Sequence, residues 1–161
     1  ERYFRVIEKK TAKLFEAACQ LGAVLSGRRD IEVDLAAYGK SLGVAFQVMD
    51  DILDYTGDDG KLGKNVGDDL AEGKPTLPLI LCRQNLERED RRLVDKVIRE
   101  GDEAHFERII ELIGTSGALR RSRQRARAAA ANAKDALEGL ERSDWSEAMN
   151  LLADYSINRE F

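Results

Sequence analysis

The apolar residues of the chain recur at helical spacing from its first residues onward. One stripe of them runs through residues 3–26 and a second through residues 31–55. Positions three and four apart lie on one face of a helix, so each stripe predicts an amphipathic helix. The first stripe consists of Phe4, Ile7, Leu14, Ala18, Leu21 and Leu25. Gly27 ends the first helix, and Asp30 can cap the second.

Residues 56–74 interrupt this pattern with glycines and no clear periodicity. A stretch of this length indicates a loop with a function, or disorder. After it, the pattern predicts a short helix near 77–84, helices over 88–100 and 102–113, a long helix from Thr115 or Ser116 to about residue 140, and a last helix from near Ser143. No strand-like alternation stands out, so we predict an all-α fold with one domain over residues 1–161.

Composition narrows the class of protein without identifying a function. The chain has 161 residues, of which 35% are charged, and a net charge of -4, which argues against a nucleic-acid or anionic-membrane binder. Cys19 and Cys82 are too few and too far apart for a disulfide framework or zinc site, which favours a reducing, cytoplasmic setting. No apolar run reaches the length of a transmembrane segment, and no signal peptide is visible. Because the helical pattern already runs at Tyr3, we expect the chain to begin inside a larger fold.

The stretch GVAFQVMDDILDY, residues 43–55, places three carboxylates on a helix that otherwise reads as buried. Gln47, Asp50, Asp51 and Asp54 are three or four positions apart and therefore project together. Like charges at this spacing destabilise a helix unless a cation lies between them, and Mg2+ is commonly held by one or two carboxylates, water and substrate phosphate. The alternative is a solvated acidic turn at a helix end. A calcium-binding loop starting at Asp54 is excluded, because its sixth and twelfth positions lack the required glycine and glutamate.

The glycine-rich loop that follows carries Lys61, Lys64 and Lys74 among acidic residues. Glycines let the backbone approach a ligand closely, and lysines supply positive charge to phosphate oxygens. The nucleotide-binding P-loop signature is absent. Taken alone, this stretch reads as a flexible solvated loop. Beside the acidic face, it predicts a diphosphate held jointly by Mg2+ and lysines.

Three other polar features are less specific. Lys10 and Thr11 in the first predicted helix read as an exposed basic patch with a hydroxyl. Gln47 on a core-facing helix suggests a positioned amide, because a buried amide needs hydrogen-bond partners. His105, the only histidine, reads as a solvated helix residue.

The order of motifs resembles a known family. The segments KKTAKLF, LGAVLSG, GVAFQVMDDILDY and GKNVGDDLAEGKPTLPLI are similar, in sequence and spacing, to the C-terminal half of trans-polyprenyl diphosphate synthases. The resemblance is strong over residues 5–82, weaker beyond them, and greatest to the octaprenyl and decaprenyl members that make quinone side chains.

The resemblance implies the C-terminal half of an all-α isoprenoid-synthase bundle, in a homodimer. It implies Mg2+-dependent condensation of an allylic diphosphate with isopentenyl diphosphate. Asp50, Asp51 and Asp54 match the second aspartate-rich motif, which binds magnesium, with Asp50 as the expected direct ligand. The other matches are Lys10 and Thr11 near the allylic diphosphate, Gln47 facing the reacting carbons and metal water, Lys64 and Lys74 contacting diphosphate, and Asp68 in a supporting role.

One departure from the family is large. Nothing in this chain supplies the family's first aspartate-rich motif, so we expect the chain alone to show no appreciable prenyl transfer. Two other hypotheses remain open: a non-catalytic helical partner subunit or diphosphate-binding module of the same fold, and a terpene cyclase or squalene-synthase-like enzyme. The absence of a recognisable Asn/Ser/Glu metal triad argues against a cyclase.

Overall fold

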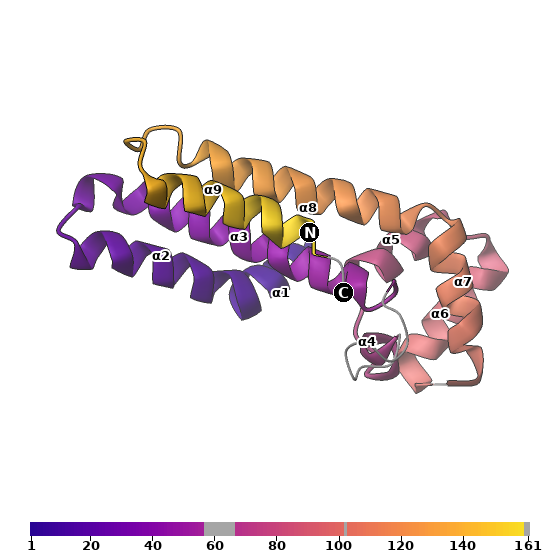
Figure 1. Cartoon of the computed structure of the whole chain (residues 1–161). Coiled ribbons are helices and arrows are strands. Elements are labelled where there is room, and N and C mark those ends of the chain that lie inside the picture. The colour runs from indigo at the N-terminus through magenta and orange to yellow at the C-terminus, as the bar shows by residue number, and fades with distance from the viewer. Residues whose placement is uncertain (57–66, 102, 160–161) are drawn as a thin grey trace. The chain divides into compact units, whose positions relative to one another are not determined.

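The computed structural model describes residues 1–56, 67–101 and 103–159, and the elements within these ranges are helical (Figure 1). Their contacts form two compact units. The first consists of Glu1–Met49 with Arg125–Glu160, and the second is centred on Asp50–Gln124. The prediction of one domain over the whole chain stays a prediction. No helix in the described ranges is long and apolar enough to cross a membrane.

The first unit is built from helical segments, the longer of which run side by side (Figure 1). In chain order they are α1 (Arg2–Ile7), a π-helix (Glu8–Ala12), α2 (Lys13–Leu25), a 3-10 turn (Arg29–Ile31), α3 (Glu32–Leu53), α8 (Ala118–Asp135) and α9 (Asp144–Ile157). The helices α3 and α8 each continue into the second unit. Tyr38, Leu42, Ala133, Leu137 and Ala153 form a buried cluster that joins α3, the end of α8 and α9.

Two glycines let α3 approach α2 and the preceding π-helix to backbone contact. A Cβ atom added to Gly39 would lie 2.4 Å from the carbonyl oxygen of Phe15, and one added to Gly43 would lie 2.6 Å from the Cα of Ala12. These distances are below van der Waals contact and involve backbone, which cannot rotate away as a side chain can. Glycine at both positions therefore sets the spacing between α3 and the segment formed by the π-helix and α2.

We expect Gly43→Ala to lower the free energy of unfolding by about 1–3 kcal/mol, the usual range for overpacking a core. Gly22→Ala is the matched control, because an added Cβ there meets nothing within 4 Å. The control should be neutral or stabilising by up to about 1 kcal/mol, since alanine favours the helix more than glycine does. Chemical denaturation of both variants tests this, and equal stabilities would show that α3 and the π-helix are not in backbone contact at Gly43.

The second unit contains shorter helices around one apolar cluster. They are α4 (Asp68–Ala71), α5 (Leu77–Asn85), α6 (Arg88–Glu100), a 3-10 turn (Glu103–His105) and α7 (Phe106–Thr115). The cluster's buried residues are Tyr55, Leu70, Leu79, Cys82, Val94, Val97, Ile109, Leu112, Ile113 and Ala118. Arg83 forms a two-pronged ion pair with Asp95 at 2.6 and 2.8 Å, which joins α5 to α6 and holds the pKa of the Asp95 carboxyl below its usual range.

The sequence pattern predicted the long helices better than their ends. The last helix starts where predicted, because Ser143 and Ser146 exchange side-chain to backbone hydrogen bonds at its first turn. Three details were wrong. The predicted loop over residues 56–74 contains α4, the long helix ends at Asp135 rather than near 140, and Asp30 binds the guanidinium of Arg28 at 2.7 Å instead of capping α3.

Candidate active site

The aspartate-rich stretch, residues 50–54, lies where α3 ends. Asp50 and Asp51 are in the last turn of α3, and Asp54 follows it. Asp50 is exposed, and its carboxylate makes no hydrogen bond or ion pair with any residue in the described part of the chain. Asp50 is therefore the aspartate whose oxygens are available to a cation.

Asp51 has a different environment from Asp50. Its side chain is only 4% exposed, and its Oδ2 accepts a hydrogen bond from the backbone N–H of Leu77 at 3.3 Å. Leu77 is the first residue of α5, and the first N–H groups of a helix have no partner within the helix. The carboxylate of Asp51 thus satisfies the start of α5 and fastens it to the end of α3.

A second buried contact lies beside the first. The hydroxyls of Tyr55 and Thr76 share a hydrogen bond of 2.8 Å, and both side chains are buried. Burial, above all, raises the pKa of Tyr55 above its ordinary value, so this hydroxyl stays protonated. Together, the Asp51–Leu77 and Tyr55–Thr76 hydrogen bonds join the residues just before the glycine-rich stretch to the residues just after it.

Asp54 anchors the next part of the chain. Its carboxylate accepts the backbone N–H of Asp69 at 3.3 and 3.5 Å, and its carbonyl accepts the N–H of Gly67 at 2.9 Å. Gly67 has a φ of +90°, a conformation that disfavours residues with a side chain. Asp54 therefore fixes the turn that starts α4.

Lys74 lies among acidic neighbours. Its Nζ contacts Oδ1 of Asp69 at 3.0 Å and also the carboxylate of Glu72. The hydrogen bond with Glu72, followed by that with Asp69, raises the pKa of Lys74 above its ordinary range. A diphosphate at this position would have to compete with two carboxylates for the ammonium group. Lys64, predicted as a second diphosphate contact, lies outside the described residues.

The first unit holds a second group of candidate residues. Lys10 and Thr11 lie on the π-helix Glu8–Ala12. A π-helical turn is wider than an α-helical turn; such turns are rare in proteins, and those that occur are often found at functional sites. The hydroxyl of Thr11 donates a hydrogen bond of 2.6 Å to Oε1 of Gln47 on α3. Lys10 is exposed. The structure thus brings the predicted residues Thr11 and Gln47 together, and the close approach at Gly43 makes this contact possible.

Magnesium is the metal that the sequence implies, and the donor set fits it. Asp50 supplies a hard, exposed carboxylate oxygen, whereas Asp51 and Asp54 already accept backbone N–H groups. Within the described residues no three acidic, histidine or cysteine side chains gather closely enough to hold a metal alone. Mg2+ characteristically uses one or two carboxylates and completes its shell with water and phosphate, so one free carboxylate is an adequate protein contribution.

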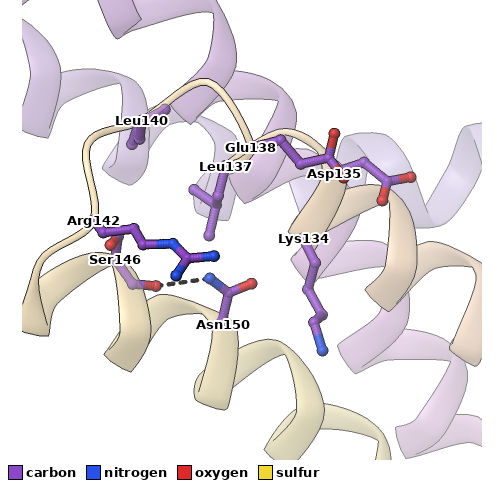
Figure 2. Close-up of a pocket in the computed structure, with 8 residues that line it drawn as sticks. All are labelled: Lys134, Asp135, Leu137, Glu138, Leu140, Arg142, Ser146 and Asn150. Carbon is purple, nitrogen blue, oxygen red and sulfur yellow. Dashed lines mark hydrogen bonds between the residues drawn. The ribbon is translucent and has the colours of Figure 1, made fainter.

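A separate hollow in the first unit does not match the predicted chemistry. It has a volume of about 400 Å³ and lies between the end of α8 and the start of α9 (Figure 2). None of the predicted site residues lines it. Its lining residues are Lys134, Asp135, Leu137, Glu138, Leu140, Arg142, Ser146 and Asn150. The ammonium of Lys134 is already paired with Asp154 at 3.0 Å, and two carboxylates line the hollow, so it is a poor site for a diphosphate.

Sequence reasoning missed Thr76 as a partner of Tyr55, and it missed Arg159, whose guanidinium lies over the ring of Phe46. Tyr55 ends the acidic stretch, so its position gave a weak signal. Thr76 and Arg159 gave none, because their partners are 21 and 113 residues away along the chain.

Comparison with known proteins agrees with this architecture. The family model of polyprenyl synthetases matches residues 1–113, and the chain belongs to this family. It is 44% identical to the octaprenyl diphosphate synthase of Escherichia coli (strain K12) over 99% of this chain and 50% of that protein. It is 41% identical to the all-trans-nonaprenyl-diphosphate synthase (geranyl-diphosphate specific) of Rhodobacter capsulatus over 98% of this chain and 48% of that protein.

A solved structure shares the fold. The polyprenyl synthase of Caulobacter crescentus CB15, complexed with calcium and isoprenyl diphosphate, matches with a TM-score of 0.91 and 42% identity, over 98% of this chain and 49% of that one. The prediction of an isoprenoid-synthase-type helical fold is therefore confirmed. The chain spans about half the length of the curated relatives it matches.

Proposed function

We propose that this chain forms the part of a trans-polyprenyl diphosphate synthase that carries its second magnesium-binding aspartate motif. The reaction would condense an allylic diphosphate with isopentenyl diphosphate and so lengthen a polyprenyl chain. Relatives named octaprenyl and all-trans-nonaprenyl diphosphate synthase support a polyprenyl diphosphate as the product class. The observation that carries the proposal is the carboxylate of Asp50, exposed and without a partner among the described residues, next to two aspartates that are already engaged.

The chain's own residues suggest a division of roles. Asp50 would hold magnesium, which, when bound, neutralises charge on the departing diphosphate. Lys10, Lys64 and Lys74 would contact diphosphate oxygens, and Lys74 would exchange one of its carboxylate partners for phosphate. Gln47, oriented by Thr11, would face the reacting carbons.

The chemistry needs no nucleophilic side chain. The C–O bond of the allylic diphosphate breaks with its electron pair leaving on diphosphate, and the double bond of isopentenyl diphosphate attacks the resulting allylic carbon. A proton then leaves the new chain for the released diphosphate. The protein's contribution is placement and electrostatic stabilisation. A long-chain product for quinone side chains, a homodimer and a cytoplasmic setting belong to the same proposal.

An assay of prenyl transfer tests the proposal. The product of the whole gene and this chain alone are each given an allylic diphosphate, labelled isopentenyl diphosphate and Mg2+. We expect the whole gene product to extend the allylic substrate and the chain alone to show no appreciable transfer. Rapid turnover by the chain alone would refute the second expectation. Mg2+-dependent binding of diphosphate without transfer by the whole gene product would favour the non-catalytic module.

A further inference from the structure

Arg159 is a buried charged residue that the proposed chemistry does not use. It follows α9 by two positions, and its side chain is 9% exposed. Its Nε donates a hydrogen bond of 3.3 Å to the carbonyl of Ser156, one of the last carbonyls of α9. The helix end thereby gains a partner for a group that the helix itself leaves unsatisfied.

The same guanidinium also contacts α3, at Phe46. Its Nη2 donates a hydrogen bond of 3.1 Å to the carbonyl of Phe46, and its Cζ lies 4.1 Å from the centroid of the Phe46 ring. That ring also contacts Phe15 on α2, with the centroids 5.5 Å apart. Arg159 therefore fixes both the backbone and the side chain of Phe46. Lysine could not do the same, because it lacks the planar fork of donors.

The residue after Phe46 is Gln47, whose Oε1 accepts the hydrogen bond from Thr11. All of these contacts lie within the first unit. We infer that Arg159 is a positioning residue for Gln47: by holding the turn of α3 at Phe46, it sets where the Gln47 amide meets Thr11. The inference rests on the proposed function, because that function gives the Gln47 amide its part in the reaction.

Nuclear magnetic resonance of this chain tests the structural link without any catalysis. The side-chain amide signals of Gln47 are assigned by their disappearance in Gln47→Glu. We expect Arg159→Met to shift them by more than their line width, because the turn at Phe46 loses its hydrogen bond and its cation. The matched control is Arg127→Met, an exposed arginine on α8 in the same unit, which should leave the signals in place.

A milder variant keeps the test decisive if Arg159→Met does not fold. Arg159→Lys retains the charge over the Phe46 ring but cannot make both backbone hydrogen bonds at once. It should shift the same signals in a folded chain. Gln47 signals that stay at their original positions in folded Arg159→Lys, or that move equally in Arg127→Met, would overturn the inference.

Kinetics of the whole gene product separate positioning from general stability. Arg159→Lys should lower kcat on the order of tenfold with little change in KM, as expected when a reacting group is displaced slightly. In a Gln47→Ala background the same change should have less than about a twofold effect, because the two residues act in series. Full additivity would overturn the link to Gln47. Failure of the unsubstituted protein to transfer prenyl groups would refute the proposed function, while the resonance experiment would still decide the role of Arg159.

Discussion

Asp50→Ala is expected to abolish Mg2+-dependent diphosphate binding while leaving the fold intact. The carboxylate is exposed and makes no hydrogen bond or ion pair with another described residue, so its removal leaves no buried group unsatisfied. If it supplies the protein's direct ligand to magnesium, prenyl transfer by the whole gene product should fall by about a thousandfold or more, which corresponds to roughly 4 kcal/mol of lost transition-state stabilisation. Calorimetric titration with inorganic pyrophosphate, with and without Mg2+, measures binding, and far-UV circular dichroism measures helicity.

Asp34→Ala provides the control, because Asp34 is an exposed acidic residue on the same helix. It should leave both pyrophosphate binding and prenyl transfer close to those of the unsubstituted protein. Pyrophosphate binding that survives in Asp50→Ala would mean that the acidic cluster is only a solvated helix end.

Asp51→Ala, in contrast, should mainly affect the fold: we expect it to lower the free energy of unfolding by about 2 kcal/mol. The substitution leaves the buried N–H of Leu77 without its carboxylate partner, and an unsatisfied buried donor typically costs about 1–3 kcal/mol. Asp51→Asn should cost less, because its amide oxygen can still accept that hydrogen bond. Asp50→Ala should change the free energy of unfolding by less than about 0.5 kcal/mol, as is usual for an exposed site.

Chemical denaturation of Asp51→Ala, Asp51→Asn and Asp50→Ala measures their free energies of unfolding and tests this prediction. A stability of Asp51→Ala equal to that of Asp50→Ala would show that the Asp51 carboxylate does not hold α5, and would return Asp51 to the list of metal ligands. The expected ranking would assign the Asp51 carboxylate to the fold and leave Asp50 as the aspartate that we propose binds the metal.

Much of the architecture could be predicted from the sequence, because helical periodicity is a local property. It predicted α3 nearly to its ends and the start of α9 at Ser143. Periodicity could not predict which apolar side chains are buried against other helices. Ile7 is buried, yet Leu14, Leu21 and Leu25, placed on the same predicted face, are 55–85% exposed.

The π-helix explains part of that difference. The turn Glu8–Ala12 is wider than an α-helical turn, so the faces before and after it are rotated relative to one another by roughly the angle of one residue. A stripe counted at one constant period through residues 3–26 therefore joins two faces that point in different directions. The secondary-structure propensities of the residues in this turn do not predict its wider geometry.

The candidate site was predicted at the level of residue types, whereas the allocation of roles depends on tertiary contacts. Spacing alone puts Asp50, Asp51 and Asp54 on neighbouring positions and makes them look equivalent. The structure distinguishes them, because segments 15 to 26 residues further along the chain return to bind two of the three. Pairings of this kind depend on how the chain closes, which local pattern does not contain.

The closure at Tyr55–Thr76 and Asp51–Leu77 has a consequence for what holds this region of the chain closed. The paired residues are 21 and 26 positions apart, so segments that are distant along the chain meet at one buried place. Bringing these segments together costs loop-closure entropy, which changes by only about 0.6 kcal/mol for each doubling of the enclosed length, so the two buried hydrogen bonds matter more to this closure than the number of residues between them.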